Sequence, residues 1–138
     1  MKIIIYTENE IVNVVMPSPS FLEDHTLEEV AAGAVPNGID YLIVEEEFLP
    51  TEMEFRNAWK LNGNIIDIDI IKAREITRER LRYEREPLLQ KLDIDMMKNW
   101  NNQMTMIEVE TEKQRLRDIT LLVDNVNSIE ELRKIRCI

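Results

Sequence analysis

Residues 70–97 read IIKAREITRERLRYEREPLLQKLDIDMM, and this stretch decides the fold. Its apolar residues recur at helical spacing and fall into one stripe on a helical wheel, which predicts an amphipathic helix. The stripe consists of Ile70, Ile71, Ala73, Leu81, Leu88, Leu89, Leu92 and Met96. A smaller apolar set lies near the opposite side of the wheel and consists of Ile76, Tyr83, Ile94 and Met97. A helix that is apolar on two sides needs two neighbours, so we expect one of them to come from another chain.

The pattern also predicts where this helix begins and ends. Asp69 is a good N-cap residue for a helix that starts at Ile70. Pro87 costs about 3 kcal/mol inside a helix, so it either kinks this helix or begins a new one. Asparagines at 99, 101 and 102 end the helix, and helical spacing resumes after Asn102 or Thr105 as cap. The spacing therefore predicts a helical hairpin.

A short terminal helix is expected after this hairpin. Ser128 is followed three residues later by Glu131, which is the pattern of a capping box. The part of the chain from residue 70 to 138 is therefore predicted to be helical throughout.

The part from residue 1 to 69 looks β-rich. Runs of β-branched residues at 2–6 and 11–15 predict a hairpin around a turn at 7–10, although the turn lacks an Asn-Gly pair. A third strand is expected at 40–45. Between them, the Thr26–Glu29 capping box predicts a short helix that ends near Gly33.

A second hairpin is the clearest of the sequence. Its strands are expected at 55–61 and 64–68, on either side of Asn62 and Gly63, which suit a two-residue turn. Trp59 is predicted to anchor the core there. A weaker capping-box match lies at 51–54. Taken together, the patterns predict an α+β protein with about five short strands in 1–69 and helices in 70–138.

Charge divides the chain at the same place. Residues 1–69 contain 3 Lys and Arg against 14 Asp and Glu, a net charge of −11, whereas residues 70–138 contain 14 against 13, a net charge of +1. Nucleic acid is therefore not expected as a partner, because phosphate binding needs a surplus of cations. The asymmetry would allow the two halves to attract each other, within one chain or between copies.

Composition points to a globular protein with a core of its own. Hydrophobic residues make up 44% of the chain, and no stretch approaches the ~20 apolar residues of a membrane span. The apolar run at the N-terminus is too short for a signal peptide. The single cysteine, Cys137, is expected to be a bystander thiol or a small apolar residue. We expect a soluble protein that makes no membrane contact.

The arginines of the long helix allow three interpretations. Five of them fall within the twelve residues 74–85, which also contain three glutamates, and a fourth glutamate follows at 86. They can form a solvated, mixed-charge helix surface, or a contact with another protein in which Arg78, Arg82 and Arg85 act with Tyr83. Nucleic-acid binding is the least favoured, because the glutamates share the helix.

No catalytic constellation is visible. Two carboxylate pairs, Asp67 with Asp69 and Asp93 with Asp95, lack the glycine and the additional oxygen ligands of a calcium loop, and strand ends and helix caps explain them more simply. His25 is the only histidine, which argues against a zinc site or a His-based triad. We expect no cofactor and no metal, and keep a metal or enzyme module on the four aspartates as the alternative.

The C-terminal half resembles small proteins of tailed bacteriophages that are described as tail assembly chaperones or tail-fibre assembly proteins. Their pattern is an arginine-rich helix of the form R-x-x-R-x-x-L-L-x-x-x-D and a second helix that ends in Leu-Arg-Asp. The matching positions are Arg82, Arg85, Leu88, Leu89, Asp93, Leu116, Arg117 and Asp118. Residues 55–59 are also similar to proteins encoded in phage structural gene clusters. The resemblance covers roughly residues 50–135.

The resemblance implies a non-enzymatic phage protein that acts through contacts with other phage structural proteins and with copies of itself. The family pattern usually places Trp directly after the helix aspartate, where this chain has Ile94. This departure favours a virion component, such as a tail or fibre accessory or adaptor, over a chaperone that leaves the particle. The expected location is the virion, or the host cytoplasm during assembly. A different alternative is an acidic phage-encoded inhibitor of a basic host protein.

The resemblance also has a physical interpretation. In an antiparallel hairpin, Arg82 or Arg85 could reach Asp118 and fix the helix register with a charged pair. The same arrangement would pack the leucines of the two helices, namely Leu88, Leu89 and Leu92, against Leu116 and Ile119.

Overall fold

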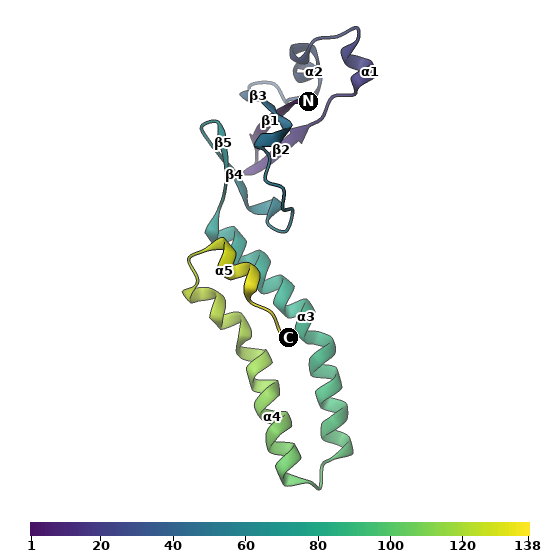
Figure 1. Cartoon of the computed structure of the whole chain (residues 1–138), viewed down its shortest axis with the longest axis vertical. Helices are drawn as coiled ribbons and strands as arrows, with labels where there is room; N and C mark the ends of the chain where they lie inside the picture. Colours follow the sequence, from purple (N-terminus) through teal and green to yellow (C-terminus); the bar gives the residue numbers. More distant parts are fainter. The chain divides into compact units, whose positions relative to one another are not determined.

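A computed structural model describes all residues from 1 to 138. The chain forms two compact units, Met1–Asp69 and Ile70–Ile138. The first unit contains five short strands, and the second is helical (Figure 1). The predicted α+β class is therefore confirmed.

Three strands of the first unit form an antiparallel sheet in the order β2-β1-β3. They are β1 (Lys2–Glu8), β2 (Ile11–Val15) and β3 (Tyr41–Glu45). Ile4 lies opposite both Val15 and Ile43, so these three side chains share a face. That face packs on helix α2 (Leu27–Ala34), with Ala31 in the same buried cluster. The predicted cap of α2 is confirmed, because the Thr26 side chain accepts a hydrogen bond from Glu29 N.

The central strand β1 is buried on both faces. Ile4 and Tyr6 point to the α2 side, and the neighbouring Ile3 and Ile5 are also buried, which places them on the other face. This second face lies toward the segment that carries Phe55 and Trp59. The continuous run of isoleucines is therefore explained by a strand that has core on each side.

The first hairpin turns through two residues with left-handed backbone. Asn9 and Glu10 have φ of 53° and 64°, between the paired residues Glu8 and Ile11. Two successive positive φ values are the mark of a type I′ turn, which usually contains Asn-Gly. The turn lies within the predicted range, but the second position holds a glutamate where glycine is preferred.

The second hairpin is displaced by one residue from its predicted turn. Strands β4 (Trp59–Asn62) and β5 (Ile65–Ile68) enclose Gly63 and Asn64 rather than Asn62 and Gly63. Gly63 has φ of 62° at the first turn position, which is where a type II′ turn places glycine. The prediction assumed a type I′ turn and therefore shifted the register.

Two further details of the first unit differ from the expected pattern. A single-turn helix α1 (Pro19–Leu22), which the sequence patterns did not predict, begins at a proline. No α-helix follows the capping-box match at 51–54, and a 3-10 turn η2 (Arg56–Ala58) leads directly into β4. The capping-box match at 51–54 is not followed by apolar residues at helical spacing, and it therefore did not predict a helix.

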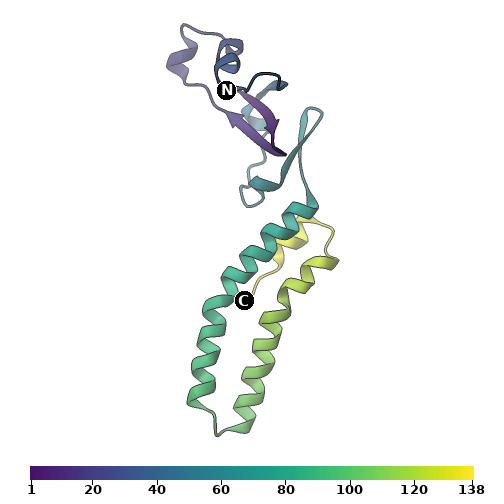
Figure 2. The ribbon, with the colours of Figure 1, turned by 180° about the vertical axis from the view of Figure 1, so that it is seen from behind.

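The second unit is an antiparallel hairpin of α3 (Ile70–Lys98) and α4 (Gln103–Asp118), followed by a 3-10 segment η3 (Ile119–Asn125) and α5 (Ile129–Lys134). Helix α5 lies beside the first half of α3, as both views show (Figure 1 and Figure 2). Asn102 is the cap of α4, since its side chain accepts from Thr105 N. Ser128 begins α5 but makes no side-chain capping bond.

Helix α3 continues through Pro87 without interruption. Of the two outcomes that the sequence allowed, a new helix is therefore excluded. The core of this unit draws on every element: Ala73, Thr77, Leu81, Val109, Leu116, Ile119, Val123, Leu132 and Cys137 are all buried. The predicted apolar stripe is confirmed except for Ile71, which is 69% exposed.

Candidate interaction surfaces

The arginines of α3 mostly bind the chain's own C-terminal segment. Arg74 Nε donates to the carbonyl oxygen of Val126 at 3.1 Å, and its Nη2 donates to the Asn127 side chain at 2.6 Å. Arg80 Nη2 donates to the carbonyl oxygens of Leu132, at 3.2 Å, and Ile135. These carbonyls lie where η3 and α5 end, so they have no helical partner.

Arg78 and Arg85 also bind groups of the second unit itself. Arg78 pairs with Glu75 on its own helix and with Asp124 of η3, and these contacts raise the pKa of its guanidinium, the hydrogen bond to Asp124 most strongly. Arg85 Nη1 donates to the carbonyls of Leu116 at 3.3 Å and Arg117 at 3.0 Å, in the last turn of α4. Cations are favoured there by the helix dipole as well. Both side chains therefore tie the second unit together internally.

Of the four residues predicted for a protein contact, only Arg82 and Tyr83 face solvent. Arg82 pairs with Glu79 on the same helix, and Tyr83 is 83% exposed. The interpretation of the arginine cluster as a mixed-charge surface did not predict the long-range contacts with carbonyl groups. Every residue has a backbone carbonyl, so the sequence does not indicate which of them accept a hydrogen bond.

The predicted pair between Arg82 or Arg85 and Asp118 does not form, so this prediction is wrong. Asp118 accepts two bonds of 3.0 Å from Gln114, four residues earlier on the same exposed helix face. Arg85 binds the backbone carbonyls of Leu116 and Arg117 instead. The register is fixed by charge in another place: Lys113, which is 9% exposed, donates to Asp93 at 2.6 Å across the hairpin.

The leucines of the phage-like pattern lie between the helices, as expected. Leu116 is fully buried, and Leu88, Leu89 and Leu92 are half-buried. Leu88, Leu92 and Leu116 line a groove of about 280 Å³ together with the last two residues, Cys137 and Ile138. Trp59 is confirmed as a core residue of the first unit, at 1% exposure.

Glu84 holds the end of the chain against α3. Its carboxylate accepts from Arg136 Nη1 at 2.8 Å and from the backbone N of Cys137 at 3.2 Å. Burial raises the pKa of Glu84. The two hydrogen bonds and the charges of Arg80 and Arg136 lower it, and their combined effect is larger than that of burial, so the net shift of the pKa is downward. The docking of the last residues is therefore linked to ionisation of this carboxyl.

Cys137 is a packed thiol. It is 2% exposed, and its Sγ lies 3.5 Å from the carbonyl oxygen of Leu81. Burial, followed by the negative charge of Glu84, raises its pKa. A thiol in this state is a poor nucleophile, as the apolar interpretation of Cys137 predicts.

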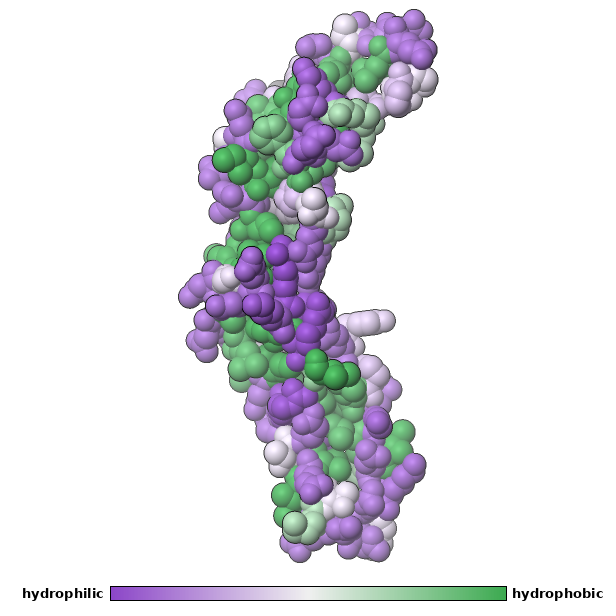
Figure 3. Space-filling model, viewed as in Figure 1, coloured by the Kyte–Doolittle hydropathy of each residue, from purple (hydrophilic) through white to green (hydrophobic).

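Several large apolar side chains are exposed to solvent near the turn of the α3–α4 hairpin. Five large apolar residues of 94–107 are exposed: Ile94 by 47%, Met97 by 69%, Trp100 by 76%, Met104 by 71% and Ile107 by 57%. They come from the end of α3, the connection and the first turns of α4. We call these five residues the apolar tip. Figure 3 shows hydrophobic surface between hydrophilic stretches along this part of the chain.

The apolar surface continues along both helices on the sides that face away from their shared core. On α3 it includes Tyr83 together with Ile94 and Met97, as the second apolar set predicted. Beyond α4 it includes Leu121 and Leu122, which are 59% and 57% exposed. The pattern of residues 70–97 predicted the α3 side. The other side was not predicted, because its residues are divided between α4, with Met104 and Ile107, and the 3-10 segment η3, with Leu121.

The aspartates considered for a metal site are not gathered together. Asp67 accepts from Asn62 at 3.1 Å within its hairpin, and Asp93 pairs with Lys113. No group of three or more His, Cys, Asp or Glu side chains is placed to hold a metal ion. None of the helices combines the length and the apolar character needed to cross a membrane.

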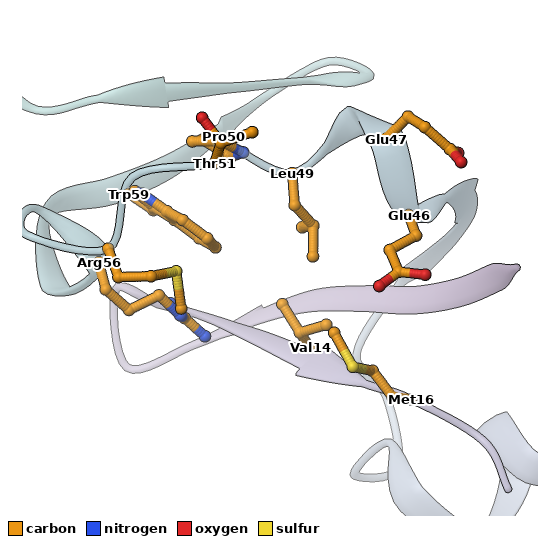
Figure 4. Close-up of a pocket in the computed structure, with 10 residues that line it drawn as sticks. Val14, Met16, Glu46, Glu47, Leu49, Pro50, Thr51, Arg56 and Trp59 are labelled. Atoms are coloured by element: carbon orange, nitrogen blue, oxygen red, sulfur yellow. The ribbon is translucent and has the colours of Figure 1, made fainter.

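The first unit contains a pocket of about 520 Å³ that the sequence did not indicate. Val14 and Met16 from β2 form one wall, and the loop with Leu49 and Met53 forms another. Trp59 closes one end with Arg56 over its ring, at 4.4 Å from the ring centre (Figure 4). Because its lining comes from three separate segments, no local pattern could have shown it.

Comparison with protein-family models, with curated protein sequences and with solved structures finds no match for this chain.

Proposed function

We propose that this chain is a non-enzymatic protein of a tailed bacteriophage, a virion component or a tail-morphogenesis protein, that acts through protein–protein contacts. The resemblance of residues 50–135 to tail and tail-fibre assembly proteins supports the phage assignment. The apolar tip of the second unit is the observation that carries the mode of action. Its partners would be other phage structural proteins or copies of the same chain.

The argument from the apolar tip is energetic. Each large apolar side chain gains about 1.5–3 kcal/mol when it is moved from water into a contact, so five of them in fourteen residues are costly to leave exposed. Contiguous exposed apolar patches are typical of protein contact sites. Trp and Met are also enriched in contact surfaces, and Trp100 is the best candidate for the dominant anchor.

The contact surface differs from the one that the sequence favoured. Arg78 and Arg85 serve the fold, so the proposed surface keeps Arg82 and Tyr83 and adds the apolar tip. A virion component and an assembly chaperone would both use such a surface. The absence of the family's tryptophan at Ile94 favours the virion component.

Two measurements test this function. The mass of the purified protein in solution gives its copy number, and mass spectrometry of purified virions from its source shows whether it stays in the particle. A fixed stoichiometry in mature virions is the expected result. Absence from virions together with a complex with a tail or fibre subunit in lysates would support the chaperone instead. Absence from both would contradict the proposal.

A further inference from the structure

The pocket of the first unit has the form of a small binding site. Its volume of about 520 Å³ lies within the range of ligand pockets, roughly 300–1,000 Å³. Most of its lining is apolar: Val14, Met16, Leu49, Pro50 and Met53 surround the space, and the Trp59 ring forms one end. In Figure 4, Val14 and Leu49 point toward each other from opposite walls. Such walls suit a large apolar group.

One cation lies in these apolar surroundings. Arg56 is the only arginine among residues 1–69, and its guanidinium group lies between the Trp59 ring and Val14. Burial lowers its pKa, and no carboxylate contributes a compensating shift. A cation that has lost part of its water gains from an anion that accepts its hydrogen bonds. Its stacking on Trp59 holds the donor group in place for such an anion.

The acidic residues of the pocket give the site a direction. Glu46 and Glu47 lie at the end away from Arg56, and Figure 4 shows the Glu46 carboxylate toward the cavity and Glu47 directed outward. An anion is therefore disfavoured at that end and favoured at the Arg56 end. The overall charge of −11 in residues 1–69 acts over a longer range and is screened by salt beyond about 8 Å.

We propose that this pocket binds a segment of a partner protein in which a large apolar side chain lies next to a carboxylate. The apolar side chain fills the space between Val14, Leu49 and Met53, and the carboxylate accepts hydrogen bonds from Arg56. This inference rests on the proposed function in one respect, that the occupant belongs to a partner protein. The pocket lies in the first unit, whereas the apolar tip lies in the second.

The test uses three small probes and the full chain. Trp100→Phe leaves Trp59 as the source of the only indole N–H signal in a nitrogen-15 NMR spectrum, and that signal is followed during titration. N-acetyl-leucine supplies an apolar side chain with a carboxylate. N-acetyl-leucinamide is the neutral match, and isopentylamine carries a positive charge on a similar apolar group.

We expect N-acetyl-leucine to shift the Trp59 signal saturably and to bind about tenfold more tightly than the amide. Arg56→Met keeps the apolar stem and should bring this ratio to about one, whereas Arg56→Lys should retain most of it. Glu47→Gln, on the outer rim, is the matched control and should leave the ratio within about twofold. The spread of signals in each spectrum verifies that the variant is folded.

Three results would overturn the inference: no saturable shift with N-acetyl-leucine, equal affinity for the acid and the amide, or tighter binding of isopentylamine. The last would indicate that Glu46 selects a basic segment instead. None of these results depends on the apolar tip. A result that contradicts ligand binding by the pocket is therefore distinguishable from a result that contradicts the proposed function.

Discussion

The arginines of α3 show how much a single residue's role depends on its distant neighbours. Arg82 and Arg85 lie three positions apart, yet one pairs with Glu79 on the surface and the other binds two carbonyls at the end of α4. Hydrogen bonds to a charged group contribute about 1.5–3 kcal/mol when the group is partly buried, whereas exposed pairs contribute about 0–1 kcal/mol. The two residues should therefore differ in their effect on stability.

Arg85→Met is expected to lower the free energy of unfolding of the second unit by about 1–2 kcal/mol, because the last carbonyls of α4 lose their donor. Arg82→Met is the matched control and should change it by less than about 0.5 kcal/mol. Urea unfolding followed by helical circular dichroism measures both. Equal effects of the two substitutions would show that the carbonyl contacts of Arg85 contribute nothing to stability.

Glu84 should make the stability of the second unit depend on pH. Its pKa is lowered in the folded state, so the unfolded chain binds more protons, and the stabilisation is present above the unfolded pKa of about 4.3 and lost as pH falls through the folded pKa. Glu84→Gln should therefore destabilise the unit at pH 7 and have a smaller effect near pH 3. Unfolding curves of the original chain and of this variant at both pH values test this. If Glu84→Gln destabilises the unit more near pH 3 than at pH 7, the prediction is contradicted.

At the scale of elements, patterns within one element were predictable, whereas the hydrogen bonds and the pocket formed between distant elements were not. The helical period of residues 70–97 identified α3, and the Thr26 and Asn102 caps are confirmed as hydrogen bonds. By contrast, the turn at Gly63 was displaced by one residue, because two turn types accept glycine at different positions. The pocket and the arginine–carbonyl contacts join segments far apart in sequence, so no periodicity could indicate them.

The first hairpin carries a correctable strain. Glu10 has φ of 64°, which costs an ordinary residue roughly 1–2 kcal/mol, whereas glycine adopts it freely. Glu10→Gly should raise the free energy of unfolding of the first unit by about 1 kcal/mol. Asn9→Gly should gain less, because asparagine tolerates this conformation. Denaturant unfolding followed by Trp59 fluorescence, with Trp100→Phe as background, measures the change. A loss of stability in Glu10→Gly would contradict the assigned turn.

Pro87 should limit the stability of α3. It lies inside the helix and cannot donate the hydrogen bond that Tyr83 O would otherwise accept. Pro87→Ala is therefore expected to raise the free energy of unfolding of the second unit by about 1–3 kcal/mol. Gln90→Ala, one turn later on the same helix, is the control and should have almost no effect. A lower melting temperature for Pro87→Ala would mean that the proline itself is needed for α3 to pack on its neighbours.

At the scale of the whole molecule, the two units carry different kinds of surface. Residues 1–69 have a net charge of −11 and an apolar pocket with a single arginine, while residues 70–138 are nearly neutral and expose the apolar tip. The sequence predicted the charge asymmetry and one apolar side of α3. It assigned the contact to arginines that the fold uses internally, because exposure is a property of the assembled helices and not of the residue type.

Site-specific cross-linking at the apolar tip tests the central claim most directly. A photo-reactive amino acid replaces Asn101, the exposed neighbour of Trp100, in one version of the chain and Asn37, in an exposed turn of the first unit, in the other. Both are irradiated in the cells that produce the protein, and the products are identified by mass spectrometry. We expect position 101 to join a phage tail or fibre protein, or a second copy of the chain, at a fixed mass ratio, and position 37 to do so far less. Equal and non-specific products at the two positions would contradict the account, because the apolar tip would then be exposed without serving as a contact.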